Sequence, residues 1–237
     1  MGSRVFGKVV KVSACAVTLA AALTACGGGQ MKMGSAVTFD KSRITTVNLD
    51  DDVTTWSKEF NKDSTANGLR KQAEDQAQSA SLPYDPTSPA RSALFWLINV
   101  RVWDKAAENQ GVTVTPADTD AVIDGRFGGE KNLDSYVLAL GLPTSQARDF
   151  ARSQAIQRGI ASKAGLLPSN AASQPTEQQS AAIDKLLQVV FAQATHALNI
   201  RVNPRYGTYP LLSQAGQVSY TLSKPDPGLN GSAALGS

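Results

Sequence analysis

The chain has 237 residues, enough for one sizeable hydrophobic core or two small ones. Its 23 lysine and arginine residues exceed its 20 aspartate and glutamate residues. However, Arg4, Lys8 and Lys11 all lie near the N-terminus, and without them the two signs balance. A chain with that balance lacks the broad basic face of a nucleic-acid-binding protein, so we expect no nucleic acid among its partners.

The N-terminal segment has the pattern of a secretory signal that leads into a lipid-attachment cysteine. Basic residues precede an apolar run of small residues at 12–22, which is shorter than the roughly 20 residues of a membrane-spanning helix. The tetrapeptide LTAC, ending at Cys26, resembles the lipobox of bacterial lipoproteins. The resemblance implies that residues 1–25 are a signal peptide and that Cys26 becomes a diacylglyceryl N-terminus. The alternative is a chance cysteine after an ordinary signal peptide.

Lipidation of Cys26 leaves the mature protein without a free thiol, because Cys15 is the other cysteine and lies in the signal peptide. A domain without disulfides depends on an ordinary hydrophobic core. Two acyl chains anchor a protein stably to a membrane, whereas one does so only marginally. We therefore expect a lipid-anchored protein on the extracytoplasmic face of the cell membrane, with residues 26–35 as a flexible, glycine-rich tether.

The first ordered elements are expected to be two short strands, 36–39 and 43–46, around a turn. Asn48 is expected to cap a helix whose start carries the carboxylates of residues 50–52. That helix has apolar residues at helical spacing, namely Val53, Trp56 and Phe60. The polar, alanine-rich segment 61–78 is expected to form a further helix.

The centre of the chain begins after a proline-rich break at 81–89, which forbids a continuous helix. Residues 89–110 form the most apolar segment after the signal, and Gly111 is expected to end this helix. Thr115, Pro116 and Asp118 have the spacing of a capped helix start. The helices that follow are expected at 115–125, 133–140 and 143–164.

The C-terminal part contains a polar linker at 165–175 and a long amphipathic helix at 176–198. The expected apolar stripe of that helix consists of Ile183, Leu187, Val190, Ala194 and Ala197. Residues 200–202 are expected to form a strand that pairs with 36–39 and closes the domain. A strand-like piece at 217–222 lies in a segment, 211–237, that we expect to be a largely disordered tail rich in Pro, Gly and Ser.

The order of these elements resembles the N-terminal chaperone domain of SurA-like and PrsA-like extracytoplasmic folding factors. The resemblance covers roughly residues 35–209 and rests on the strand pair, RIT before a helix, an apolar helix ending QGVTVT, the helix-linker-helix and the closing NPRYG. It implies a mainly α-helical, SurA-N-like domain over residues 36–210. Larger family members carry a parvulin-type prolyl isomerase domain between the last two helices, where this chain has only 165–175. The resemblance therefore implies a chaperone-like role without isomerase activity.

The sequence contains no pattern typical of an enzyme, a cofactor site or a metal site. His196 is the only histidine and is expected on the solvent-facing side of its helix. Residues 50–52 lack the spacing of a calcium-binding loop, and the paired glycines within 126–132 lack that of a phosphate-binding loop. We expect a charged helix start at the first and a helix break at the second.

Four residues are candidate contacts for a client or partner: Trp96, Trp103, Arg205 and Tyr206. The two tryptophans lie on the second apolar face of segment 89–110, and a helix that is apolar on both faces is usually buried on both. We prefer a core position for Trp103, and the alternative is a groove for clients. Arg205 and Tyr206 lie in NPRYG, which we interpret first as a turn that locks the closing strand and second as a partner contact.

These observations predict a membrane-anchored, chaperone-like module that holds unfolded or partly folded secreted proteins. The alternative is a lipoprotein without chaperone activity that scaffolds an envelope protein complex or binds a small apolar ligand.

Overall fold

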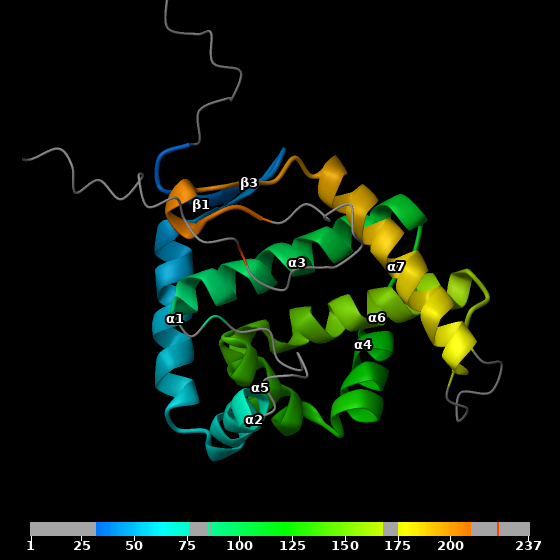
Figure 1. Ribbon diagram of the computed structural model, residues 1–237, viewed down its shortest axis with the longest axis horizontal. Coiled ribbons are helices and arrows are strands. Elements are labelled where there is room, and N and C mark those ends of the chain that lie inside the picture. The colour runs from blue at the N-terminus through cyan, green and yellow to red at the C-terminus, as the bar shows by residue number, and fades with distance from the viewer. Residues whose placement is uncertain (1–31, 76–84, 86, 168–174, 210–221, 223–237) are drawn as a thin grey trace, which may run out of the picture. The chain divides into compact units, whose positions relative to one another are not determined.

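Helices make up most of the described residues, and a small antiparallel sheet joins residues near both ends of the described chain (Figure 1). The computed structural model describes residues 32–75, 85, 87–167, 175–209 and 222. The elements follow one another as β1 (Ser35–Thr38), β2 (Arg43–Thr45), α1 (Thr46–Phe60), α2 (Ser64–Asp75), α3 (Pro89–Gln110), α4 (Pro116–Val122), η1 (Ile123–Phe127), α5 (Glu130–Leu140), η2 (Thr144–Gln146), α6 (Ala147–Lys163), α7 (Glu177–Ala197), β3 (Arg201–Val202) and η3 (Pro204–Tyr206). The predicted signal peptide, Cys26 and most of the predicted tether lie outside the described residues.

The three strands are arranged in the order β2-β1-β3, with β1 in the centre. Val37 is buried and lies opposite Ile44 of β2 and Val202 of β3. Asn203 extends the pairing: its backbone N–H donates to the carbonyl of Ala36 at 2.8 Å. The predicted strand pair and the predicted closing strand are therefore confirmed, and the sheet satisfies the backbone of β1 on both edges.

Helix α1 begins earlier than predicted, and the expected cap by Asn48 is wrong. The side chain of Thr45 accepts a hydrogen bond from the backbone N–H of Asn48 at 3.1 Å, so Thr45 is the N-cap and Asn48 lies in the first turn. Both residue types cap helices well. Thr45 is the N-cap because it is the last residue of β2 and therefore has the extended backbone that an N-cap requires. As a result, residues 50–52 lie beyond the first turn.

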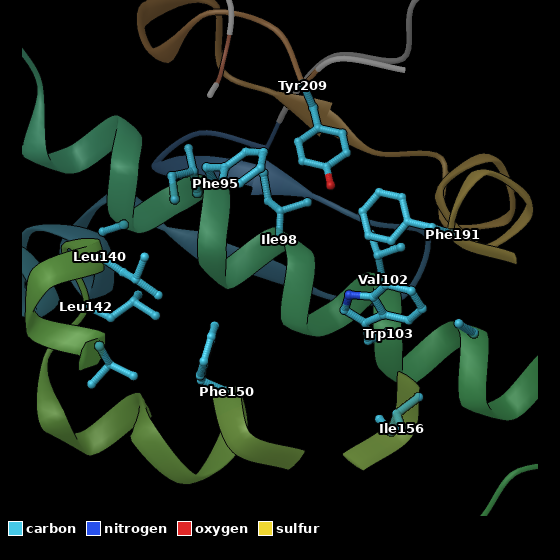
Figure 2. Packing of buried hydrophobic residues seen from close by; sticks show 14 of the residues in the cluster. Phe95, Ile98, Val102, Trp103, Leu140, Leu142, Phe150, Ile156, Phe191 and Tyr209 are labelled. Carbon is cyan, nitrogen blue, oxygen red and sulfur yellow. The ribbon is translucent and has the colours of Figure 1, made fainter. Parts of the chain in front are cut away.

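Helix α3 passes through the middle of the fold and has the predicted bounds. It contacts α1, α6 and α7, and residues on all of its sides are buried between Arg91 and Val100. Ser88 caps its start, and Gly111 ends it in the left-handed conformation at φ 58°. The core around this helix, drawn in Figure 2, combines side chains from α3, α5, α6, α7 and the C-terminal segment.

Three predicted helix bounds between α4 and α6 differ from the structure. The predicted capping box of Thr115 and Asp118 is present, but the α-helix ends at Val122 and continues as the π-helical turn η1 instead of ending near residue 125. Gly128, at φ 72°, then breaks the helix as expected. Helix α5 starts at Glu130 instead of residue 133, because it follows directly after the glycine pair. Helix α6 is preceded by the single turn η2.

The buried face of α7 differs from the predicted stripe. Val190 and Ala194 are buried as expected, whereas Ile183 and Leu187 are only partly buried and Ala197 is exposed. Phe191 is buried instead, and its ring lies 5.1 Å from that of Trp103 in α3, centroid to centroid. The interface with α3 lies at the C-terminal half of α7. The residues of α7 that are buried there therefore lie on one side of the predicted stripe.

Candidate functional site

Trp103 is a core residue, as the preferred interpretation predicted. Its side chain is 9% exposed and packs against Phe191 between α3 and α7. Figure 2 shows the two rings on facing elements, with Val102 beside them. This position leaves Trp103 little surface for a client.

Trp96 lies about two turns earlier on α3 and has a different environment. It is only partly buried, and its ring makes edge contacts with Phe95 at 5.4 Å and Phe150 at 5.6 Å between centroids. Phe150, from α6, is buried and also contacts the rings of Phe127 and Tyr136. Rings from α3, η1, α5 and α6 therefore meet on Phe150, and we call this group the aromatic cluster.

Two further rings of the aromatic cluster are also partly exposed. Phe127 ends the π-helical turn, Tyr136 lies on α5, and their ring centroids are 5.4 Å apart. Partial burial raises the pKa of Tyr136, an effect that the nearby charge of Arg126 opposes. Arg126 donates to the side chain of Gln154 at 2.7 Å and lies beside Phe127. The cluster is thus an apolar surface of fixed rings with a cation at its edge.

The NPRYG segment is a turn that follows the closing strand. The side chain of Asn203 donates to the carbonyl of Ser35 at 3.1 Å and accepts from the backbone N–H of Arg205 at 3.2 Å. Tyr206 is 4% exposed, and desolvation by burial raises its pKa. Arg205 is exposed and lies over the ring of Tyr206 at 4.6 Å. Tyr206 therefore belongs to the core, and of the two predicted contact residues only Arg205 is at the surface.

A buried ion pair at the start of α3 was not predicted from the sequence. Arg91 forms an ion pair with Asp85 at 2.9 Å, and the two side chains are 7% and 13% exposed. Arg91 also donates to the backbone carbonyl of Leu222, which is buried although it lies in the predicted tail. A sequence signal existed, because a lone arginine at the start of the most apolar segment needs a nearby carboxylate when it is buried. The remainder of 211–237 lies outside the described residues.

An open hollow of about 320 Å³ lies between the start of α4 and α6. Arg148 and Arg152 line it together with Val114 and Thr119. Arg148 donates to Asp120 at 2.6 Å and to Glu130 at 2.9 Å, and Arg152 donates to Asp104. Carboxylates therefore already balance both cations, which makes the hollow a weak candidate for an anionic ligand.

The other predictions concern chemistry and the membrane. His196 is exposed on α7, as expected. Within the described ranges, no group of three or more His, Cys, Asp or Glu residues is arranged to hold a metal ion. Among the same residues, no helix has both the length and the apolar character of a membrane span. Cys26 lies outside the described residues, so its lipidation stays a prediction.

Comparisons of the chain with protein families, with curated proteins and with solved structures find no match.

Proposed function

We propose that the protein is a lipid-anchored, extracytoplasmic module that holds unfolded or partly folded secreted proteins without isomerising prolines. The domain is proposed to be SurA-N-like, with β1 and β3 closing it and a short linker in place of an inserted catalytic domain between α6 and α7. The anchor at Cys26 would keep the domain at the cell membrane, where secreted chains emerge unfolded.

The observation that carries this proposal is the aromatic cluster. Trp96, Phe127 and Tyr136 are each partly exposed, and all three are fixed on the buried ring of Phe150. Grouped apolar surface that stays accessible in a folded domain usually marks a binding site. Aromatic rings add contact area at low entropic cost and accept many different apolar side chains. Such a surface suits clients that share exposed apolar residues but no common sequence.

The cluster suits an extended client better than a small ligand, because its rings come from four elements and pack directly on one another. It differs from the Trp103 position, which is filled by Phe191. The structure thus separates the two tryptophans that share a face of α3, and only Trp96 supports a client contact.

The test compares Trp96→Ala with Trp96→Phe in the full-length lipidated protein. We expect Trp96→Ala to raise the protein concentration that half-suppresses aggregation of a chemically denatured client by about tenfold, equivalent to ~1.4 kcal/mol of binding free energy. Trp96→Phe, which keeps a ring, is expected to retain most of the holding activity. Light scattering of the client measures both, normalised to the folded fraction from circular dichroism.

Tyr136→Phe is the matched control, because it removes one hydroxyl and leaves the ring in place. Unchanged holding by folded Trp96→Ala would contradict the role of the aromatic cluster. Absence of holding by the wild-type protein, together with a single stoichiometric partner in a membrane pull-down, would favour the envelope-scaffold alternative.

The anchor has its own test. Cys26→Ala is expected to abolish incorporation of a fatty-acid analogue and to release the protein from the membrane fraction. The folded domain should keep its melting temperature, because every described core residue lies after the tether. Equal labelling of the wild-type and Cys26→Ala proteins would rule out the lipoprotein assignment.

A further inference from the structure

The N-terminal half of α3 has a further buried face, next to the aromatic cluster, that packs against residues of the C-terminal segment. Arg91 and Phe95 are four residues apart, so they lie on one side of the helix, which we call the Arg91 face. Tyr209 stacks on Phe95 with 6.0 Å between ring centroids, and Figure 2 shows its ring beside Phe95 and above Ile98. One turn away, Arg91 donates from Nη2 to the carbonyl oxygen of Leu222.

Both covering residues belong to the C-terminal part of the chain. Tyr209 is 8% exposed and Leu222 is 2% exposed, and both belong to the main hydrophobic cluster. Residues 210–221 separate them in the sequence. Among the described residues of the C-terminal segment, Tyr209 and Leu222 contact the Arg91 face.

The chemistry of the Arg91 face suits a polypeptide backbone. Asp85 already balances the charge of Arg91 through Nη1, so the guanidinium does not require an anionic ligand. Nη2 donates to a backbone carbonyl, and Nε is buried without a hydrogen-bond partner among the residues that the structure describes. A buried donor without an acceptor is unfavourable. A further backbone carbonyl would satisfy it, and every polypeptide offers such carbonyls.

We propose that the Arg91 face is a binding site for an extended polypeptide with an apolar side chain, and that Leu222 occupies it within the same chain. The guanidinium recognises backbone oxygens independently of sequence, while the surrounding core residues accept the leucine side chain. A client would bind by displacing Leu222. This inference rests on the proposed holding function and gives that function a second contact site, next to the aromatic cluster.

The experiment uses a peptide with the sequence of residues 217–227, QVSYTLSKPDP, that carries a photoreactive leucine at the Leu222 position. It is added to the full-length lipidated protein in lipid nanodiscs, and the crosslinked residues are mapped by mass spectrometry. We expect crosslinks to α3 near Arg91. The yield should be about tenfold higher in Leu222→Gly, because covalent attachment gives the native leucine an effective concentration on the order of millimolar.

Two controls distinguish recognition of the peptide backbone from nonspecific hydrophobic binding. An unlabelled peptide with Leu222→Asp should not compete with the photoreactive peptide, whereas an unlabelled peptide with shuffled flanking residues and one leucine should compete as well as the parent sequence. Arg91→Lys keeps a positive charge opposite Asp85 but loses the forked donor geometry. We expect this variant to crosslink about tenfold less than the wild type at the same folded fraction.

Absence of crosslinks to α3 in both the wild-type and the Leu222→Gly protein would overturn the inference. If Leu222→Gly does not fold, the wild-type protein decides alone, because millimolar peptide must then compete with Leu222 and crosslink to α3. The aggregation assay distinguishes the two proposals. Crosslinking without client holding contradicts the holding function only, and client holding without crosslinking contradicts the Arg91 face only.

Discussion

The main hydrophobic cluster around α3 and the smaller cluster around Trp56 join the helices by different means. The main cluster buries many aliphatic and aromatic side chains from most elements of the domain. The smaller cluster has only three buried members, Trp56, Ala66 and Leu138, with Val53 and Phe60 packed against them. So few apolar contacts provide little burial energy at the corner where α1, α2 and α5 meet.

Directional bonds supplement the smaller cluster. The indole N–H of Trp56 donates to the carbonyl of Leu138 at 2.8 Å. Arg70 donates to the carbonyls of Leu138 at 3.1 Å and Ala139 at 2.8 Å, and its guanidinium lies 4.0 Å from the ring centroid of Phe60. These acceptors belong to the last turn of α5, where the carbonyls lack the i+4 partners of a continuing helix and the helix dipole favours a cation; the carbonyl of Leu138 also accepts from the backbone N–H of Gly141. Polar bonds thus fix a corner that apolar burial alone would hold weakly.

The largest effect is expected in the main cluster, from Trp103→Ala. Removing this buried ring should lower the free energy of unfolding by about 3–5 kcal/mol, because Phe191 and its neighbours cannot fill the space. Chemical denaturation of the full-length protein measures the loss. Trp103→Phe should cost clearly less. A wild-type unfolding curve for Trp103→Ala would show that the ring is not part of the core.

A smaller and local effect is expected from Arg70→Ala in the corner cluster. Loss of hydrogen bonds from a charged donor should cost about 1.5–3 kcal/mol. Arg70→Lys is the matched control, since it keeps the charge but loses the forked geometry, and it should recover only part of the loss. Hydrogen exchange should accelerate in α1 and α2 before α3. Uniform acceleration in all helices would contradict a separate corner.

The smallest effect is expected from Asp63, which precedes α2. Its carboxylate accepts from the backbone N–H of Ala66 and from the hydroxyl of Ser135, each at 2.8 Å. Asp63→Ala should cost about 0.5–2 kcal/mol, as is typical for the loss of a helix cap. Asp63→Asn should retain most of this stability at neutral pH, because an amide oxygen also accepts hydrogen bonds.

The contribution of Asp63 depends on pH in a defined direction. Desolvation raises the pKa of Asp63, but the hydrogen bonds from Ala66 and Ser135 outweigh it, so the folded-state pKa lies below the usual value of about 3.9. The carboxylate therefore stabilises the fold fully above about pH 4, and this contribution is lost as the pH falls through the folded-state pKa. The stability difference between wild type and Asp63→Asn should shrink between pH 5 and pH 3. A difference independent of pH over that range would contradict the assignment.

Local chemistry determined the parts of the fold that the sequence predicted correctly. Thr115, Pro116 and Asp118 define a helix start within four residues, and Gly111 and Gly141 define helix ends because they adopt the left-handed backbone. The three strands were also predictable, since short apolar segments near both ends of a domain need partners for their backbone groups. Each of these features depends on hydrogen bonds and dihedral angles of neighbouring residues or on a simple pairing requirement.

Only the tertiary structure decided which of several equivalent residues caps a helix and which of them is covered by another element. Thr45 and Asn48 are both good caps, and the geometry of β2 selects Thr45. Trp96 and Trp103 share a face of α3, and they differ because Phe191 of α7 covers one of them. The sequence identified Trp96 as a candidate but could not identify Phe127, Tyr136 and Phe150 as its neighbours. Burial is set by elements distant in the sequence, so a local pattern shows which residues can be buried but not which of them another element covers.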